Sequence, residues 1–205
     1  MLWRGRFRFG RRLLALLALA ASLLPLSAQA QERRYLVVDE VKFAVLPHDP
    51  SLLGGKEGGA DLNGEILFAS PVRDVVAATV PAFLRWMVQP RPYFGFQANT
   101  SGYTSQGYFG LTWTWLLGGN LLRPGDGVEF GIGFGPGFNN GLIRTQRPDR
   151  QSLGSHVLFH VSAEIGYRIT PRYTISVFLD HSSDGGFARE NQSLNDVGLR
   201  FGIRF

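Results

Sequence analysis

The sequence predicts an all-β protein, an eight-stranded antiparallel transmembrane β-barrel of the outer-membrane type. Eight segments of the chain alternate apolar and polar residues, which is the side-chain period of a β-strand. The last segment, residues 195–205, ends on the aromatic Phe205 and has the length of about 9–11 residues that a membrane-crossing strand needs. After residue 30 the sequence shows no apolar run of the length of a membrane-spanning helix, so the chain is better suited to a barrel.

Each segment has one apolar face. In residues 195–205, Val197, Leu199 and Phe201 are apolar, whereas Asp196 and Arg200 between them are charged. A barrel in lipid turns its apolar faces outward and its polar faces inward, the reverse of a soluble sandwich. The strands that we expect are residues 35–47, 61–70, 92–100, 106–117, 127–138, 155–169, 172–183 and 195–205.

The inward faces carry charges. Side chains fill the interior of an eight-stranded barrel, so we expect a closed wall rather than a pore. Buried charges must be paired, and we expect a buried network of Glu40, Lys42, Glu65, Glu129, Glu164, Arg168, Arg200 and Arg204. With both termini periplasmic, the loops near 48–60, 100–105, 138–154 and 184–194 face outward. Residues 71–91 fit a strand poorly and suggest a short interfacial helix.

The first thirty residues predict a cleaved signal peptide. Five arginines precede the apolar run 13–24, and Ala28-Gln29-Ala30 fits a cleavage site. The run is short for a membrane anchor, which is the alternative. Residues 31–205 then form a single β-barrel domain of a size usual for one domain.

The mature chain has no net charge. The leader holds five of the 21 Lys and Arg residues and none of the 16 Asp and Glu residues, which leaves 16 basic residues against 16 acidic ones. Nucleic-acid binding therefore has no electrostatic basis. The chain has no cysteine, which excludes disulfides and thiol chemistry.

The seventh strand carries two polar residues on its outward face. Its odd-numbered residues up to Leu179 are apolar, and the same parity places His181 and Ser183 outward, near the extracellular end. Residues i and i+2 of a strand lie about 7 Å apart, so the imidazole and the hydroxyl can form a base–nucleophile pair. The alternative is a polar strand end at the membrane interface, without catalysis.

Asn195 begins the outward series of the last strand. A symmetric hairpin over 184–194 places Asn195 opposite Ser183 and diagonal to His181, where a residue that orients the ring belongs. Asp196 has the inward parity and is expected to point away.

This region resembles the C-terminal signature of the outer-membrane lipid A 3-O-deacylase (PagL) family, whose members are also called acyloxyacyl hydrolases. The resemblance rests on Leu-Asp-His-Ser-Ser-Asp-Gly-Gly at 179–186, on Asn191 and Leu194, and on the alternating end at 197–205. Segments 45–49, 58–71, 110–115, 153–155 and 164–168 are also similar to relatives of that group, so the similarity covers nearly the whole mature chain.

The resemblance implies an eight-stranded barrel with a Ser-His-Glu triad on its lipid-facing surface. Ser183 would be the nucleophile and His181 the general base, and Asn191 and the backbone amide of Gly186 would stabilise the oxyanion. Asn195 stands at the position of the family's triad acid. The chain also departs from the family pattern after the nucleophile, where Asp184 replaces the usual Asn. Asp196 and Glu190 are the alternative candidates for the triad acid.

We therefore expect an outer-membrane serine esterase that removes the ester-linked 3-position acyl chain, a 3-hydroxy fatty acid, from lipid A of lipopolysaccharide. The alternative is a catalytically silent barrel with a structural or lipid-binding role, because Asn195 has no carboxylate charge. The sequence shows no cluster of metal ligands, so we expect no metal and no cofactor. The expected partners are lipopolysaccharide and the membrane, and the expected state is a monomer or a homodimer.

Overall fold

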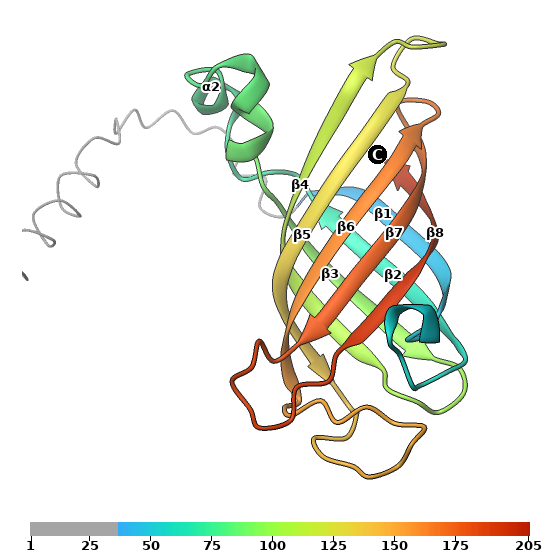
Figure 1. The fold of residues 1–205 in the computed structure, drawn as a ribbon. Helices are drawn as coiled ribbons and strands as arrows, with labels where there is room; N and C mark the ends of the chain where they lie inside the picture. The colour runs from blue at the N-terminus through green and yellow to red at the C-terminus, as the bar shows by residue number, and fades with distance from the viewer. Residues whose placement is uncertain (1–36) are drawn as a thin grey trace, which may run out of the picture. The chain divides into compact units, whose positions relative to one another are not determined.

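The computed structural model describes residues 37–205. They form a closed antiparallel barrel in which every strand pairs with its sequence neighbours and β1 pairs with β8 (Figure 1). The strands are β1 (Val38–Pro47), β2 (Ala60–Phe68), β3 (Arg91–Asn99), β4 (Gln106–Gly119), β5 (Gly127–Asn139), β6 (Val157–Arg168), β7 (Tyr173–Ser183) and β8 (Leu194–Arg204). The predicted eight-stranded barrel is confirmed.

The strand ends lie within a few residues of the predicted ones. The predicted signal peptide and its cleavage site lie outside the described residues. Over residues 37–205, the structure contains no helix that is long and apolar enough to cross a membrane.

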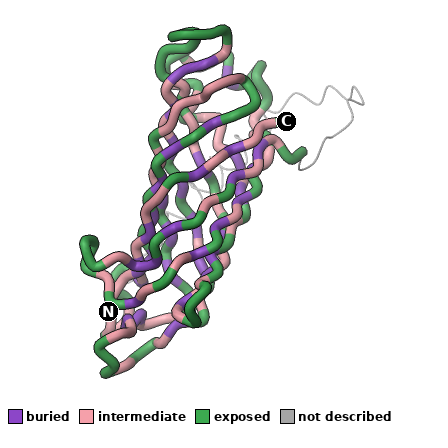
Figure 2. The backbone as a smooth tube through the Cα atoms, turned by 90° about the vertical axis from the view of Figure 1, so that its right-hand side faces the viewer, coloured by how far each residue is buried: buried purple, intermediate pink, exposed green. Residues whose placement is uncertain are grey.

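The strands alternate between exposed and buried residues, as Figure 2 shows along the barrel wall. In β7, Ile175, Val177 and Leu179 are exposed, whereas Ser176 and Phe178 between them are buried. The predicted outward apolar parity is therefore present on this strand.

The barrel interior is filled by paired charges. The guanidinium of Arg200 stacks on the ring of Phe178, 3.3 Å from its centroid, and bonds to Glu65 at 3.3 Å. Arg91, which the sequence analysis did not include, bonds to Glu40 at 2.8 Å. All eight charges predicted to lie inside form ion pairs: Lys42 with Glu40 and Glu164, Arg200 with Glu65 and Glu164, Arg204 with Glu40 and Glu129, and Arg168 with Glu129.

Between β2 and β3, where we expected a short helix, the chain forms two: the helix α2 (Asp74–Ala77) and the 3-10 helix η2 (Ala82–Val88). Pro81 precedes η2, and a proline cannot continue a preceding helix without losing a backbone hydrogen bond. The segment is fixed to β4, because Trp86 stacks on Trp115 with centroids 5.6 Å apart and Trp113 Nε1 donates to the Met87 carbonyl at 2.9 Å.

The loops at the other end of the barrel position the site. The β1–β2 loop contains the 3-10 helix η1 (Ser51–Leu53), and it meets the β5–β6 loop through the side chain of Gln151, which donates to Asp49 at 2.8 Å. The β7–β8 loop also contacts the β5–β6 loop, because the backbone amide of Gln192 donates to the backbone carbonyl of Ser152 at 3.0 Å.

Candidate active site

The ends of β7 and β8 bring His181, Ser183 and Asn195 together. His181 is exposed, and Ser183 and Asn195 are half-buried. In the strand register Asn195 lies directly opposite His181, so our expectation that it lies opposite Ser183 was wrong by two residues. A two-residue shift leaves every side chain on its original face of the strand, and the predicted outward position of Asn195 is therefore retained.

The three side chains form a continuous chain of hydrogen bonds. Ser183 Oγ lies 3.0 Å from His181 Nε2, and His181 Nδ1 lies 2.8 Å from Asn195 Oδ1. The amide nitrogen of Asn195 donates to Ser193 Oγ at 3.3 Å, which turns the Asn195 carbonyl oxygen toward the ring. That oxygen can only accept, so Nδ1 carries the proton and Nε2 is free to accept the Ser183 proton.

This arrangement can support nucleophilic catalysis. A hydroxyl within hydrogen-bond reach of a correctly oriented imidazole is the usual signature of an activated serine. Asn195 supplies the orientation that a triad acid supplies, but it supplies no negative charge to stabilise the imidazolium.

The two alternative acids lie elsewhere. The side chain of Asp196 is fully buried in the barrel interior, where Oδ1 accepts from the Asp49 amide at 2.9 Å. Glu190 pairs with Arg144, with Nε and Oε1 3.6 Å apart. Neither carboxylate makes a hydrogen bond with His181 in the described part of the chain, so the suggestion that one of them replaces the triad acid is not supported by the contacts.

The predicted oxyanion donors differ in availability. The Gly186 amide donates to Asp184 Oδ1 at 2.7 Å, and the same carboxylate accepts from the Ala188 amide at 3.0 Å. Asp184 thus folds the loop, and the Gly186 amide is already used, contrary to its expected role. The side chain of Asn191 is exposed, and it lies next to this turn, since a Cβ built on Gly186 would stand 3.9 Å from its Nδ2.

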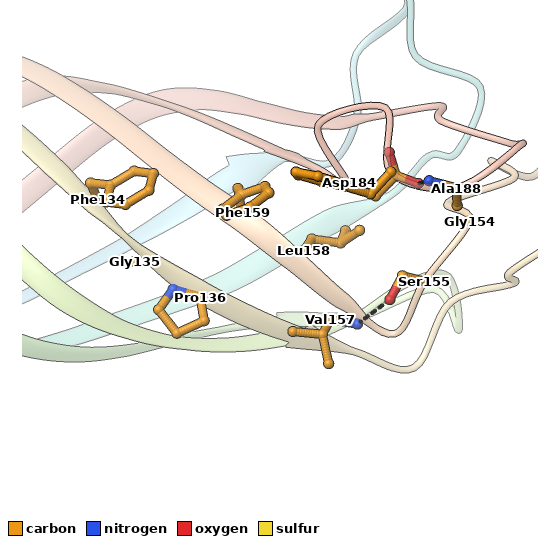
Figure 3. A pocket seen from close by; sticks show the side chains of 11 residues that line it. Phe134, Gly135, Pro136, Gly154, Ser155, Val157, Leu158, Phe159, Asp184 and Ala188 are labelled. Atoms are coloured by element: carbon orange, nitrogen blue, oxygen red, sulfur yellow. Dashed lines mark hydrogen bonds between the residues drawn. The ribbon is translucent and has the colours of Figure 1, made fainter. Parts of the chain in front are cut away.

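An apolar groove of about 460 Å³ begins beside the nucleophile. Phe159, one of the residues that line it, lies opposite Ser183 in the register of β6 and β7. Its ring packs 6.2 Å from that of Phe134 and 5.9 Å from that of Phe187, measured between centroids. Figure 3 shows Phe134 and Phe159 in line along the wall with Asp184 at the loop end. Sequence reasoning missed the groove, because its residues come from three separate segments.

A buried polar cluster lies on the inner side of β8. His48 Nδ1 is 2.9 Å from Asp61 Oδ2 and 3.5 Å from Asp196 Oδ1, and His48 Nε2 is 3.3 Å from Glu57 Oε2. Burial lowers the pKa of His48, but the hydrogen bonds to Asp61 and Glu57 outweigh burial and raise it to about 10. Burial raises the pKa of Glu57, but its bonds to His48 and to two backbone amides lower it to about 2.

Part of this cluster has the residue types of a metal site, which the sequence analysis did not single out. His48, Asp61 and Asp196 each offer a ligand atom, and these atoms lie within 4.8 Å of one another. No local sequence pattern predicts this cluster, because Asp196 is far from the other two residues along the chain and meets them only where the barrel closes between β1 and β8.

The comparisons with known proteins concern the fold and the family of the chain. A solved structure described as the crystal structure of the outer membrane enzyme PagL superposes with a TM-score of 0.58 at 14% identity, over 81% of this chain and 99% of that chain. At this identity the likeness concerns the fold. A comparison with curated proteins found no match. The family model described as lipid A 3-O-deacylase (PagL) matches residues 79–204, more than half of the chain, and the chain therefore belongs to the lipid A 3-O-deacylase (PagL) family.

Proposed function

We propose that the protein is a serine esterase of the outer membrane that removes the ester-linked 3-position acyl chain from lipid A and releases a 3-hydroxy fatty acid. The observation that carries this proposal is the hydrogen-bonded chain Ser183–His181–Asn195 on the outer wall of the barrel. Family membership supplies the substrate class. The exposed apolar wall supports a location in lipid, where a triad facing outward meets a substrate that diffuses in the same plane.

Acyl transfer begins at Ser183. Its Oγ attacks the ester carbonyl while the hydroxyl proton passes to His181 Nε2, and the carbonyl electrons move to the oxyanion. The tetrahedral intermediate collapses to an acyl-serine, and His181 returns the proton to the departing sugar oxygen. Water then attacks the acyl-serine by the same route in reverse and yields the free fatty acid. Asn191 is the side chain that we assign to the oxyanion.

The groove beside Ser183 is the place for the acyl chain. Phe134, Phe159 and Phe187 form a row of neighbouring aromatic rings, and the middle one, Phe159, lies opposite the nucleophile Ser183. An apolar chain in this row would leave its ester carbonyl near Ser183, which is the geometry that an acyl transfer requires.

A second candidate function is a catalytically silent lipid-binding barrel of the same family. The observation that favours it is Asn195, which offers His181 an amide oxygen and no carboxylate, so that the imidazolium formed during acyl transfer would have no negatively charged partner. Both functions use the same groove and differ in whether the ester bond is broken.

Lipid A profiling separates the two. The protein is expressed in a Gram-negative host whose lipid A keeps its 3-position acyl chains, and lipid A is analysed by mass spectrometry. The esterase produces a species that has lost one 3-hydroxyacyl chain, and the Ser183→Ala variant does not. If both proteins are folded in the outer membrane and lipid A stays intact in both, the silent barrel is the correct function.

A further inference from the structure

We propose that His48, Asp61 and Asp196 bind a zinc ion inside the barrel, at the end that carries the candidate active site. The three residues come from the end of β1, from β2 and from β8. They lie on the inner side of the wall, whereas Ser183 and His181 lie on its outer side. The proposal therefore does not rest on the esterase function.

The ligand set is arranged around one ring nitrogen. His48 Nδ1 faces Asp61 Oδ2 at 2.9 Å and Asp196 Oδ1 at 3.5 Å. A zinc ion binds imidazole nitrogen and carboxylate oxygen at about 2.0–2.2 Å, so ligand atoms spaced at these distances need to separate only slightly to admit it. The ion takes the place of the Nδ1 proton, which is released to solvent, and three protein ligands leave the fourth position to water.

An independent observation also calls for a cation. Asp196 is fully buried, and its Oδ2 has no hydrogen-bond partner in the described part of the chain. Asp180 is buried directly opposite Asp196 in the register of β7 and β8, and Asp61 and Glu57 are buried on the two ring nitrogens of His48. Among the described residues, these carboxylates pair with His48, Arg150 and His160. Buried carboxylates in this excess are costly unless a positive charge compensates them. Replacing one proton by a divalent ion adds one positive charge to this group of carboxylates and gives Asp196 Oδ2 a cation nearby.

Hydrogen bonds around the site hold the His48 ring in place. A histidine that binds a metal almost always donates its other N–H to a carboxylate or carbonyl, which fixes the ring. Here His48 Nε2 lies 3.3 Å from Glu57 Oε2. Glu57 is in turn held by the backbone amides of Thr104 at 2.8 Å and Gln151 at 3.1 Å.

The ligand chemistry selects zinc over calcium. Calcium takes about 6–8 oxygen ligands in a loose shell, whereas one imidazole and two carboxylates match the smaller coordination number of zinc. The same contacts connect the site to Asn195, because the Asp49 amide donates to Asp196 Oδ1 at 2.9 Å and the Asn195 amide donates to Asp49 Oδ1 at 3.4 Å. The ion would thus fix the start of β8.

The test measures bound metal. The protein is purified from outer membranes, loaded with zinc or calcium in separate samples, desalted, and its metal content determined by mass spectrometry. We expect about one zinc per chain in wild type and about a tenth of that or less in His48→Gln and Asp61→Asn. His156→Gln is the matched control, because His156 is exposed and removing it should leave the zinc in place.

Two results overturn the proposal: a wild-type protein without stoichiometric zinc, or a His48→Gln protein that keeps it. The mobility shift between unboiled and boiled samples on a gel shows whether each variant is folded. If the variants do not fold, X-ray absorption at the zinc edge of the loaded wild type decides. A shell of about four N and O ligands near 2.0 Å that includes one imidazole supports the site, and a shell without imidazole refutes it.

Discussion

Replacing Asn195 by Asp should accelerate the reaction, and the structure shows why. The two side chains have the same shape, so the Asp oxygen stays about where Asn195 Oδ1 is now, 2.8 Å from His181 Nδ1. When Ser183 attacks, His181 takes up its proton and becomes a cation. A carboxylate stabilises that cation by charge, whereas the Asn195 amide does not.

The gain can be worked out from what Asn195 already does. Changing the triad Asp of a serine protease to Asn costs about 10⁴ in turnover, largely because the amide selects the wrong tautomer. Here Ser193 holds the amide nitrogen away from the ring, so the tautomer is correct and the charge alone is missing. Two charges about 4 Å apart interact by about 4 kcal/mol at an effective dielectric of about 20. Asn195 is half-buried, and solvent reduces this to about 1.5–3 kcal/mol, the range of a hydrogen bond to a charged group. The rate should rise about 10- to 160-fold.

The assay follows release of 3-hydroxy fatty acid from purified lipopolysaccharide in mixed micelles. It compares wild type, Asn195→Asp and Asn195→Glu, the last carrying the residue that the family has at this position. A double variant that also carries Ser183→Ala should lose the gain, which shows that the gain passes through Ser183. The reasoning fails if Asn195→Asp is folded and no faster than wild type.

The other predictions use the same assay. Ser183→Ala and His181→Ala should each abolish fatty-acid release without altering the gel shift of the folded barrel, because both side chains lie on the outer wall. Ser182→Ala is the control and should retain activity. A loss of activity in Ser182→Ala would contradict the assignment of Ser183 as the nucleophile. Ser193→Ala should slow the reaction about tenfold or more, because the amide of the triad position becomes free to turn toward the ring; an unchanged rate would show that Ser193 does not fix that amide. Phe187→Ala should raise KM for long acyl chains more than for short ones, and equal effects on both would remove Phe187 from the acyl groove.

Alternation was enough to predict the barrel because lipid imposes it on every strand. The odd positions of β7 could be assigned outward as far as Ser183, since a strand keeps its parity over its whole length. The paired interior charges followed from the same rule. The segment between β2 and β3 was less predictable, because its apolar residues do not follow one period and Pro81 divides it.

The positions of site residues within one strand could be predicted, whereas the contacts between residues of different strands could not. His181 and Ser183 are neighbours on β7, so their contact could be foreseen. The partner of His181 depends on the register of β7 and β8, which the hairpin length does not reveal, and Asn195 was placed two residues away from its true partner. The cluster around His48 depends on closure of the barrel, and the engagement of the Gly186 amide by Asp184 depends on how one loop folds. None of these has a local sequence pattern.

The charges inside the barrel also constrain the order in which the chain folds. Arg200 and Glu65 are 135 residues apart in the chain, and Arg204 and Glu40 are 164 apart. These pairs form when β1 meets β8, which joins the two ends of the sheet. Contacts at such long range form slowly, and a sheet that enters lipid before it closes leaves these groups desolvated and unpaired. Insertion and closure should therefore occur as one cooperative step, and substitutions that unpair these charges should slow assembly more than substitutions on the lipid-facing wall.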